Sequence, residues 1–458
     1  MRTLLLALTG LLALAAVPAA AQTASWPMVQ GGPEHRGVAA GAPDPPYRVD
    51  WEIEAGESGH RGAAGPVVVG DLAIAVGREE VFAADTRTGA IRWTIARAPD
   101  PPVIPAVGDD GATLVYPEGA GDARAVIGLD LATHAVRWRF KPDAEVRSAP
   151  AAAGDAFYVA SRIGTISALD ARTGAERWSF DADGEVFGPI AVSDGVVYVA
   201  AEDTVSFETT VYAIDADDGA QRWQFKPQRR GVFASGPAVE GERVFLGFGD
   251  GSVRALQVSN GSPVWTRTLA LGQGFGPGAT PALIDGDVVV TSRDGSVSRL
   301  EGATGDRRWR FRVPGGFVQS SPLVVGDTVV AGGADGFIVA LDLSTGRRVW
   351  QLDLGGGPVG AIAPAGDRLL VGLGAAGGGI VALEHDPEGE LTSVESPTVL
   401  KPVVAVGNFA IAFVALTAGL LLGSRLIRRE RPAAGTGGGR DAEAAAPGAD
   451  DAPPGGFR

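Results

Sequence analysis

The 458-residue sequence contains no cysteine, four histidines and three lysines, so almost all of its positive charge comes from arginine. Without cysteine, the chain has no disulfide, no thiol nucleophile, no cysteine-ligated zinc or iron–sulfur centre and no lipoprotein acylation site. The histidines lie in separate segments, at His35, His60, His134 and His385, without the spacing of metal ligands. We therefore predict neither a metal site nor a cofactor.

Positive charge is scarce as a whole, because 39 basic residues face 54 acidic ones and give a formal net charge of −15. Sequence-independent binding of nucleic acid needs clustered Lys and Arg against phosphates. The charge therefore argues against nucleic acid as a partner. Glycine (67) and proline (31) are frequent, but hydrophobic residues make up 45% of the chain. This composition indicates a folded protein rich in turns.

Long hydrophobic runs occur only at the two ends. Residues 1–21 combine Arg2, an apolar run and small residues before Gln22, which predicts a signal peptide; an uncleaved N-terminal anchor is the alternative. Residues 403–423 contain no charge and are followed by Arg425, Arg428, Arg429 and Arg431. Their length and the flanking arginines predict a transmembrane helix with its C-terminal end in the cytoplasm, although a buried core helix is an alternative.

These two segments divide the chain. Residues 22–400 are predicted to be extracytoplasmic, between a signal peptide and a single-pass anchor in the cell membrane. Residues 424–458 are rich in glycine, proline and alanine and are predicted to form a disordered cytoplasmic tail.

Tryptophans mark a repeat along the extracytoplasmic part. After Trp26, successive tryptophans lie 40 to 45 residues apart. A period of this length with strand-like content is typical of a β-propeller. The eight positions are Trp51, Trp93, Trp138, Trp178, Trp223, Trp265, Trp309 and Trp350.

One repeat unit, residues 320–350, illustrates the pattern within a period. Short β-branched runs at 323–325, 328–331 and 337–341 are separated by the turns Gly326-Asp327 and 334–336. A corner at Ser344-Thr345-Gly346 leads to a fourth run that holds Trp350. Short alternating runs bounded by Gly and Asp are typical of antiparallel strands, so each unit is predicted to be a four-stranded blade.

The corner before each tryptophan follows the pattern Asp-x-x-Thr-Gly-x-x-x-Trp, with variants in several units. Glycine permits a left-handed backbone there, and the tryptophan ring is expected to fill the space between blades. We assign these residues a structural role and no catalytic one. Trp51 lacks three preceding strands and the last unit lacks a tryptophan, so residues 48–53 are predicted to supply the outer strand of the last blade. This closure gives an all-β, eight-bladed propeller; seven blades with an irregular first segment is the alternative.

The corner motif and the initial segment Trp26-Pro27-Met28-Val29-Gln30-Gly31-Gly32 resemble the pyrroloquinoline-quinone-type propeller repeat family. The resemblance covers residues 26–383 and implies the fold. The family includes quinone-dependent alcohol dehydrogenases and non-enzymatic members such as the propeller subunit of the bacterial outer-membrane barrel assembly machinery. In the enzymes the quinone lies beside calcium, under paired cysteines and over a tryptophan. This chain has no cysteine, so we expect a non-enzymatic member.

One set of residues before the first strands of the blades is a candidate binding ring. Phenylalanines recur there at Phe187, Phe233, Phe275 and Phe317, with Arg147, Arg229, Arg230 and Gln319 nearby. Because equivalent connections of a propeller lie at one mouth of its channel, these side chains are expected to face a peptide or a glycan. The alternative is that the phenylalanines pack between inner strands. An insert at residues 202–210 is a second candidate, since insertions in repeats often map to the binding face.

From these observations the sequence predicts a membrane-anchored scaffold that binds a protein or cell-envelope partner without catalysis. A quinone-dependent oxidoreductase and a ligand sensor are the alternatives. The tail contains no effector domain, so a sensor would need a partner to transmit its signal.

Overall fold

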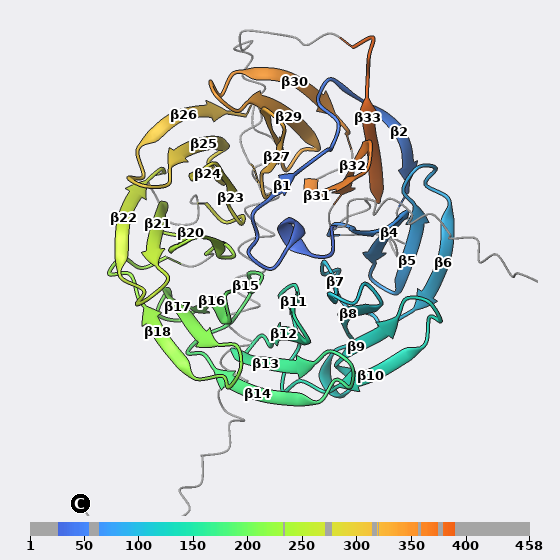
Figure 1. Ribbon diagram of the computed structural model, residues 1–458, viewed down its shortest axis with the longest axis vertical. Helices are drawn as coiled ribbons and strands as arrows, with labels where there is room; N and C mark the ends of the chain where they lie inside the picture. The colour runs from blue at the N-terminus through green and yellow to red at the C-terminus, as the bar shows by residue number, and fades with distance from the viewer. Residues whose placement is uncertain are drawn as a thin grey trace, which may run out of the picture. The chain divides into compact units, whose positions relative to one another are not determined.

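The computed structural model describes residues 26–54, 64–231, 234–270, 277–313, 318, 320–355, 359–373 and 379–389. These residues form eight sheets arranged as a ring (Figure 1). The predicted eight-bladed, all-β propeller is confirmed. Among the described residues, no helix has the length and apolar character needed to span a membrane. The predicted signal peptide and the predicted transmembrane helix lie outside these residues.

The first four blades each contain four antiparallel strands. Blade 1 consists of β3 (Val67–Val69), β4 (Leu72–Val76), β5 (Glu80–Asp85) and β6 (Ile91–Ala96). Blade 2 consists of β7 (Ala106–Val107), β8 (Thr113–Glu118), β9 (Ala125–Asp130) and β10 (Val136–Phe140), with η2 (Gly121–Ala123) in its middle hairpin. Blade 3 consists of β11 (Ala151–Ala153), β12 (Ala156–Ala160), β13 (Thr165–Asp170) and β14 (Glu176–Asp181). Blade 4 consists of β15 (Ala191–Ser193), β16 (Val196–Asp203), β17 (Glu208–Asp215) and β18 (Gln221–Phe225).

The remaining blades repeat this order until the ring closes. Blade 5 consists of β19 (Ala238–Glu240), β20 (Arg243–Gly247), β21 (Ser252–Gln257) and β22 (Pro263–Thr268). Blade 6 consists of β23 (Ala282–Ile284), β24 (Asp287–Thr291), β25 (Ser296–Glu301) and β26 (Arg307–Arg312). Blade 7 consists of β27 (Leu323–Val325), β28 (Thr328–Gly332), β29 (Phe337–Asp342) and β30 (Arg348–Asp353), joined by β1 (Val38–Ala39). Blade 8 consists of β31 (Val359–Ala365), β32 (Arg368–Leu373), β33 (Ile380–His385) and β2 (Tyr47–Ile53).

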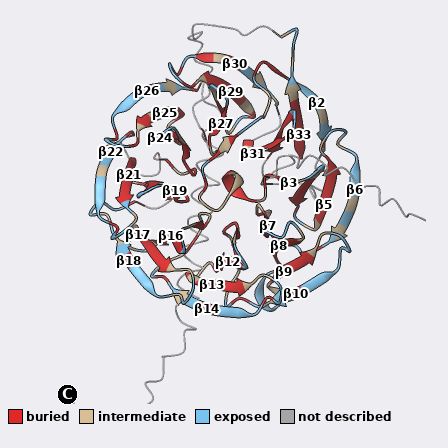
Figure 2. Ribbon diagram, viewed as in Figure 1, coloured by how far each residue is buried: buried red, intermediate tan, exposed pale blue. Residues whose placement is uncertain are grey.

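The two faces of the ring carry different loops. Because the strands of a blade alternate in direction, the links between successive blades lie on the same face as the hairpins between second and third strands. We call this the connection face. The opposite face, called the corner face, carries the hairpins between first and second strands and the Asp-Thr-Gly corners. The three inner strands of the blades are largely buried, whereas the outer strands are largely exposed (Figure 2).

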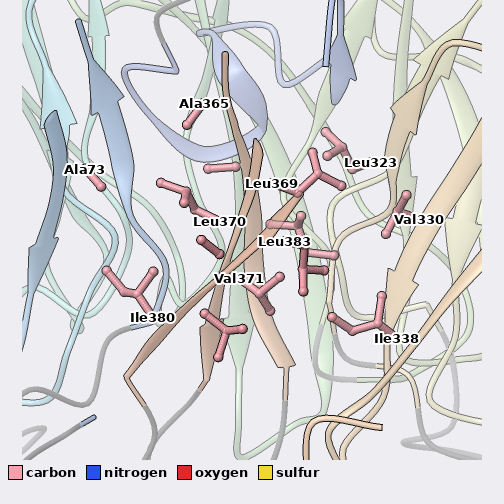
Figure 3. Close-up of a cluster of buried hydrophobic side chains, with 14 of the residues drawn as sticks. Ala73, Leu323, Val330, Ile338, Ala365, Leu369, Leu370, Val371, Ile380 and Leu383 are labelled. Atoms are coloured by element: carbon pink, nitrogen blue, oxygen red, sulfur yellow. The ribbon is translucent and has the colours of Figure 1, made fainter. Parts of the chain in front are cut away.

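Blade 8 is assembled from both ends of the described chain. Strand β2 pairs antiparallel with β33, with Val49 opposite Leu383 and Ile53 opposite Ile380. The predicted closure by residues 48–53 is therefore confirmed. A continuous apolar cluster crosses this seam from Leu323 of blade 7 through Leu370 of blade 8 to Ala73 of blade 1 (Figure 3). The seam is thus packed like any other blade boundary.

Each repeat tryptophan packs against the following blade. Six of the indole N–H groups donate to a corner carbonyl of the next blade at 2.7–3.2 Å, those of Trp51, Trp138, Trp178, Trp223, Trp265 and Trp309. The Trp93 ring lies 4.8 Å from the ring of His134, which occupies the glycine position of its corner with φ of 59°. Trp350 meets Tyr47 of β2 edge to face at 5.0 Å. The indoles therefore join all eight blades.

Hydrogen bonds around an aspartate fix most of the corners, as blades 3 and 4 illustrate. In blade 3 the Asp170 carboxylate accepts from the main chain and hydroxyl of Thr173 and pairs with Arg177 at 2.8 Å. Arg177 and the Thr173 hydroxyl lower the pKa of Asp170 below its usual range. In blade 4 Asp215 accepts from the Asp217 amide and pairs with Arg222 in the same way. These carboxylates therefore hold turns.

The N-terminal part of the described chain crosses the centre of the ring (Figure 1). We call residues 26–39 the plug; they include η1 (Val29–Gly31). The inner strands present an open edge with unpaired N–H groups toward the channel. Plug carbonyls accept hydrogen bonds at 2.8–2.9 Å from six of these strands, through the amides of Val68, Val107, Val192, Val239, Leu283 and Val324. The plug thereby pairs with the inner strands of six of the eight blades.

Two plug side chains point from these main-chain contacts toward the starts of inner strands. The Gln30 amide lies 3.2–3.4 Å from the carbonyls of Thr280, Pro281 and Pro322, to which it donates. The His35 Nδ1 atom lies 2.8 Å from the Pro237 carbonyl. Because a carbonyl only accepts, the neutral His35 ring carries its proton on Nδ1. Both side chains are buried.

The burial of His35 predicts a measurable pH dependence. Burial lowers the pKa of His35 to about 4, from an ordinary value of 6.5. The unfolded chain therefore binds a proton at this site before the folded chain does, and stability falls as pH drops from 6.5 toward 4. His35→Asn keeps an N–H donor and tolerates the left-handed backbone at this position, where φ is 57°. We expect the variant to lose less stability over this pH range in urea titrations; parallel curves for the two proteins would refute the assignment.

Candidate binding face

The predicted binding residues that the structure describes all lie in connections between blades. Arg147 precedes β11 by four residues and Phe187 precedes β15 by four, so the two occupy equivalent positions in neighbouring blades. Arg229 and Arg230 are exposed in the connection before β19. Phe233, Phe275, Phe317 and Gln319 lie outside the described residues. A ring of phenylalanines therefore stays a prediction.

Arg147 lies against a neighbouring connection. Its Nη1 atom lies 3.2 Å from Oδ1 of Asp100, whose side chain is buried between blades 1 and 2. Arg97 approaches the same carboxylate at 3.8 Å. Burial raises the pKa of Asp100, and the two guanidinium groups oppose this shift. Arg147 therefore stabilises a buried carboxylate as well as lining the face.

A belt of charges that sequence reasoning missed continues around the same face. Arg162 lies 3.7 Å from both Glu145 and Glu185, and so joins the connections before β11 and β15. Glu202 is buried and accepts from the Ala234 amide at 2.7 Å. Aligning the repeats places Arg162, which follows β12, and Glu202, which lies within the longer β16, at equivalent positions. That alignment would have revealed charged residues at the same position of neighbouring blades.

The insert singled out in the sequence lengthens one hairpin on this face. Strands β16 and β17 have eight residues each, whereas the corresponding strands of blades 3 and 5 have five or six. The hairpin tip carries Val205 and Phe207, which are both exposed. Arg229 and Arg230 belong to the connection that follows the same blade. The insert therefore brings apolar and basic side chains together on the connection face.

The described residues do not match the set that holds quinone and calcium in the enzymatic members. The chain has no cysteine, and the eight repeat tryptophans pack between blades. Trp26 lies against Gly31 inside the plug, where an added Cβ would come within 2.5 Å of the ring. No group of three or more His, Asp or Glu side chains in the described ranges is placed to hold a metal ion. The side chains in these ranges therefore do not fit a quinone held beside calcium.

Comparison with known families assigns the chain. Residues 77–162, 122–276 and 270–396 match the family described as outer membrane protein assembly factor BamB, and together these matches span 320 of 458 residues. The chain belongs to this family. No curated protein matches the chain.

Solved structures of diverse proteins share the propeller of this family member. BamB from Moraxella catarrhalis is 18% identical with a TM-score of 0.58, and the match covers 74% of this chain and 100% of that one. The computationally designed Ika8 protein is 16% identical with a TM-score of 0.62, and the match covers 71% of this chain and 96% of that one. A europium-containing methanol dehydrogenase is 15% identical with a TM-score of 0.62, and the match covers 78% of this chain and 90% of that one. At these identities the likeness shows the fold alone, and the fold hosts both an assembly factor and a dehydrogenase.

Proposed function

We propose that this chain is a membrane-anchored, extracytoplasmic propeller that binds a protein or cell-envelope partner as a non-catalytic scaffold. Its membership of the family named for an assembly factor supports the binding role. The use of its tryptophans in blade packing, and the lack of cysteine, argue against the quinone site of the enzymatic relatives.

The observation that carries the proposal is that the described chain leaves the propeller on one face and the candidate binding residues lie on the other. The Asp386 amide donates to the Pro46 carbonyl at 2.8 Å, so the last described residues leave from the corner face beside β2. Thirteen residues separate Gly389 from Val403, a reach of at most about 50 Å. An anchor at 403–423 would therefore be connected to the propeller through its corner face. The connection face, with Arg147, Arg229 and Arg230, lies on the other side of the ring from this exit and is the face that we propose binds the partner.

The absence of native cysteine makes the topology directly testable. We expect Arg229→Cys in the full chain to react with a membrane-impermeant maleimide on cells whose outer barrier is permeable. Arg440→Cys in the tail should react only after lysis. Labelling of the tail but not of position 229 in intact cells would overturn the proposed orientation.

Partner binding and catalysis are separated by two further measurements. In-cell crosslinking of the full chain, followed by mass spectrometry, should recover one recurrent partner attached to connection-face residues. Purified chain supplied with pyrroloquinoline quinone, calcium and alcohols should not reduce a redox dye. Dye reduction, or crosslinks spread evenly over both faces, would contradict the scaffold role.

A further inference from the structure

The hairpin tip of blade 4, residues 203–208, exposes two apolar side chains close together in the sequence. Val205 is 45% exposed and Phe207 is 42% exposed. The other large hydrophobic side chains with comparable exposure in the described residues, Val49, Ile91, Val136 and Val264, all belong to outer strands. The tip is thus a distinct apolar point on the connection face.

Hydrogen bonds hold this tip in one conformation. Asp203 accepts from the amides of Val205 and Ser206 at 2.8 and 3.1 Å. The Phe207 carbonyl accepts from the Gly231 amide at 2.7 Å, which ties the tip to the connection before β19. Phe207 has φ of 58°, a left-handed conformation that is costly for a bulky side chain. A strained, tethered and exposed aromatic residue is typical of a functional surface.

Basic side chains of the connection before β19 lie beside the tip. Lys226 pairs with Glu208 at 2.8 Å, and Arg230 lies 3.9 Å from the same carboxylate. Arg230 keeps 65% of its side chain exposed. Arg229 is exposed and has no ion pair among the described side chains. Three cations within five residues face the two carboxylates of the tip, Asp203 and Glu208, so the patch has a small positive excess in a chain of net charge −15, and Arg229 and Arg230 present it to solvent.

We propose that the tip docks an acidic segment of a partner protein, whose apolar side chain covers Val205 and Phe207 and whose carboxylates pair with Arg229 and Arg230. The proposal rests on the scaffold function and names the chemistry of its partner. Charge complementarity selects this occupant, and arginine favours two-point contacts with carboxylates. Burial of a rigid aromatic side chain beside arginine is typical of residues that dominate binding energy.

An anionic bilayer is the less favoured occupant. The described chain leaves from the corner face, opposite the tip, and the overall negative charge of the chain repels anionic lipids. Lipid contact is therefore an outcome that would overturn the proposal.

The test places a photoreactive amino acid at Val205 in the full chain and irradiates living cells. We expect a crosslink to one protein, through a peptide rich in Asp and Glu. Reversal of charge in Arg229→Glu with Arg230→Glu should lower its yield about tenfold or more. The matched control, Arg87→Glu with Arg172→Glu, makes the same charge change at exposed corner-face positions and should leave the yield unchanged.

A second pair of variants tests the apolar contact. Val205→Ser with Phe207→Asn removes both apolar side chains and keeps a residue that tolerates the left-handed backbone. The control is Val264→Ser, at a site of 39% exposure on outer strand β22. We expect only the tip variant to lose partner capture by a general crosslinker in cells.

The outcomes distinguish this inference from the function on which it rests. If both the charge-reversed chain and the tip variant still capture the partner, the scaffold role stands and the proposal that the tip docks this partner is refuted. A crosslink from position 205 to lipid, or to a segment without acidic residues, would also overturn it. Failure of the unaltered chain to capture any partner would overturn the scaffold function itself.

Discussion

Gln30→Glu is expected to destabilise the propeller by about 3–5 kcal/mol at neutral pH, the usual cost of an uncompensated buried charge. The Gln30 amide is buried and donates toward the carbonyls of Thr280, Pro281 and Pro322. A carboxylate at this position would face these oxygens without a donor. Urea-induced unfolding followed by tryptophan fluorescence would measure the loss.

The pH dependence of the stability loss distinguishes the effect of the buried charge from the effect of the lost hydrogen bonds. The new carboxyl group would have a raised pKa in the folded state, so its penalty exists above the ordinary value of about 4.3 and disappears as pH falls. Gln30→Met removes the hydrogen bonds without adding charge and should cost about 1–3 kcal/mol, with the same pH profile as the unaltered chain. A penalty for Gln30→Glu that stays constant down to about pH 4 would show that the side chain does not face carbonyls.

The second large effect is expected at a blade corner. Gly219 has φ of 76°, and an added Cβ would lie 2.8 Å from the Trp178 ring of the preceding blade. Gly219→Ala therefore combines a left-handed alanine, about 1–2 kcal/mol, with overlap against a packed ring, about 1–3 kcal/mol. The sum of about 2–5 kcal/mol should appear as a lower unfolding midpoint.

A turn glycine of the same blade isolates the two contributions. Gly195 has φ of 72°, but nothing lies within 4 Å of an added Cβ. Gly195→Ala should therefore show only the backbone cost of about 1–2 kcal/mol. Equal losses in the two variants would mean that contact with Trp178 contributes nothing at the corner.

The blade architecture was predictable because its information is local and repeated. A tryptophan, a corner and two turns recur every 40 to 45 residues, and the tryptophan and corner contact their own or a neighbouring blade. The closure by β2 followed from counting, since one end lacked three strands and the other lacked one. Hence the number and connectivity of the blades could be predicted without the structure.

The plug could not be predicted in the same way. Gln30 reaches residues 250 to 292 positions away, and His35 reaches Pro237 across 202 positions. Residues 26–39 have no repeat counterpart, so no periodic pattern exposes these contacts. The predicted ring of phenylalanines shows a different difficulty, because equivalent positions of the repeat need not carry the same side chain. Phe187 and Arg147 occupy equivalent positions, so neighbouring connections differ in chemistry rather than repeating one side chain.

The path of the plug also sets an order of events during synthesis. Its residues leave the ribosome before those of any complete blade, yet the Gln30 partners at the starts of β23 and β27 are made 250 to 292 residues later. Strand β2 must likewise wait for β33. The plug therefore cannot complete its hydrogen bonds to the inner strands until β27 exists. Such long-range closure is intrinsically slow and leaves strand edges open to association. The nascent chain is thus most vulnerable just before completion, when nearly every blade has formed and the ring is still open.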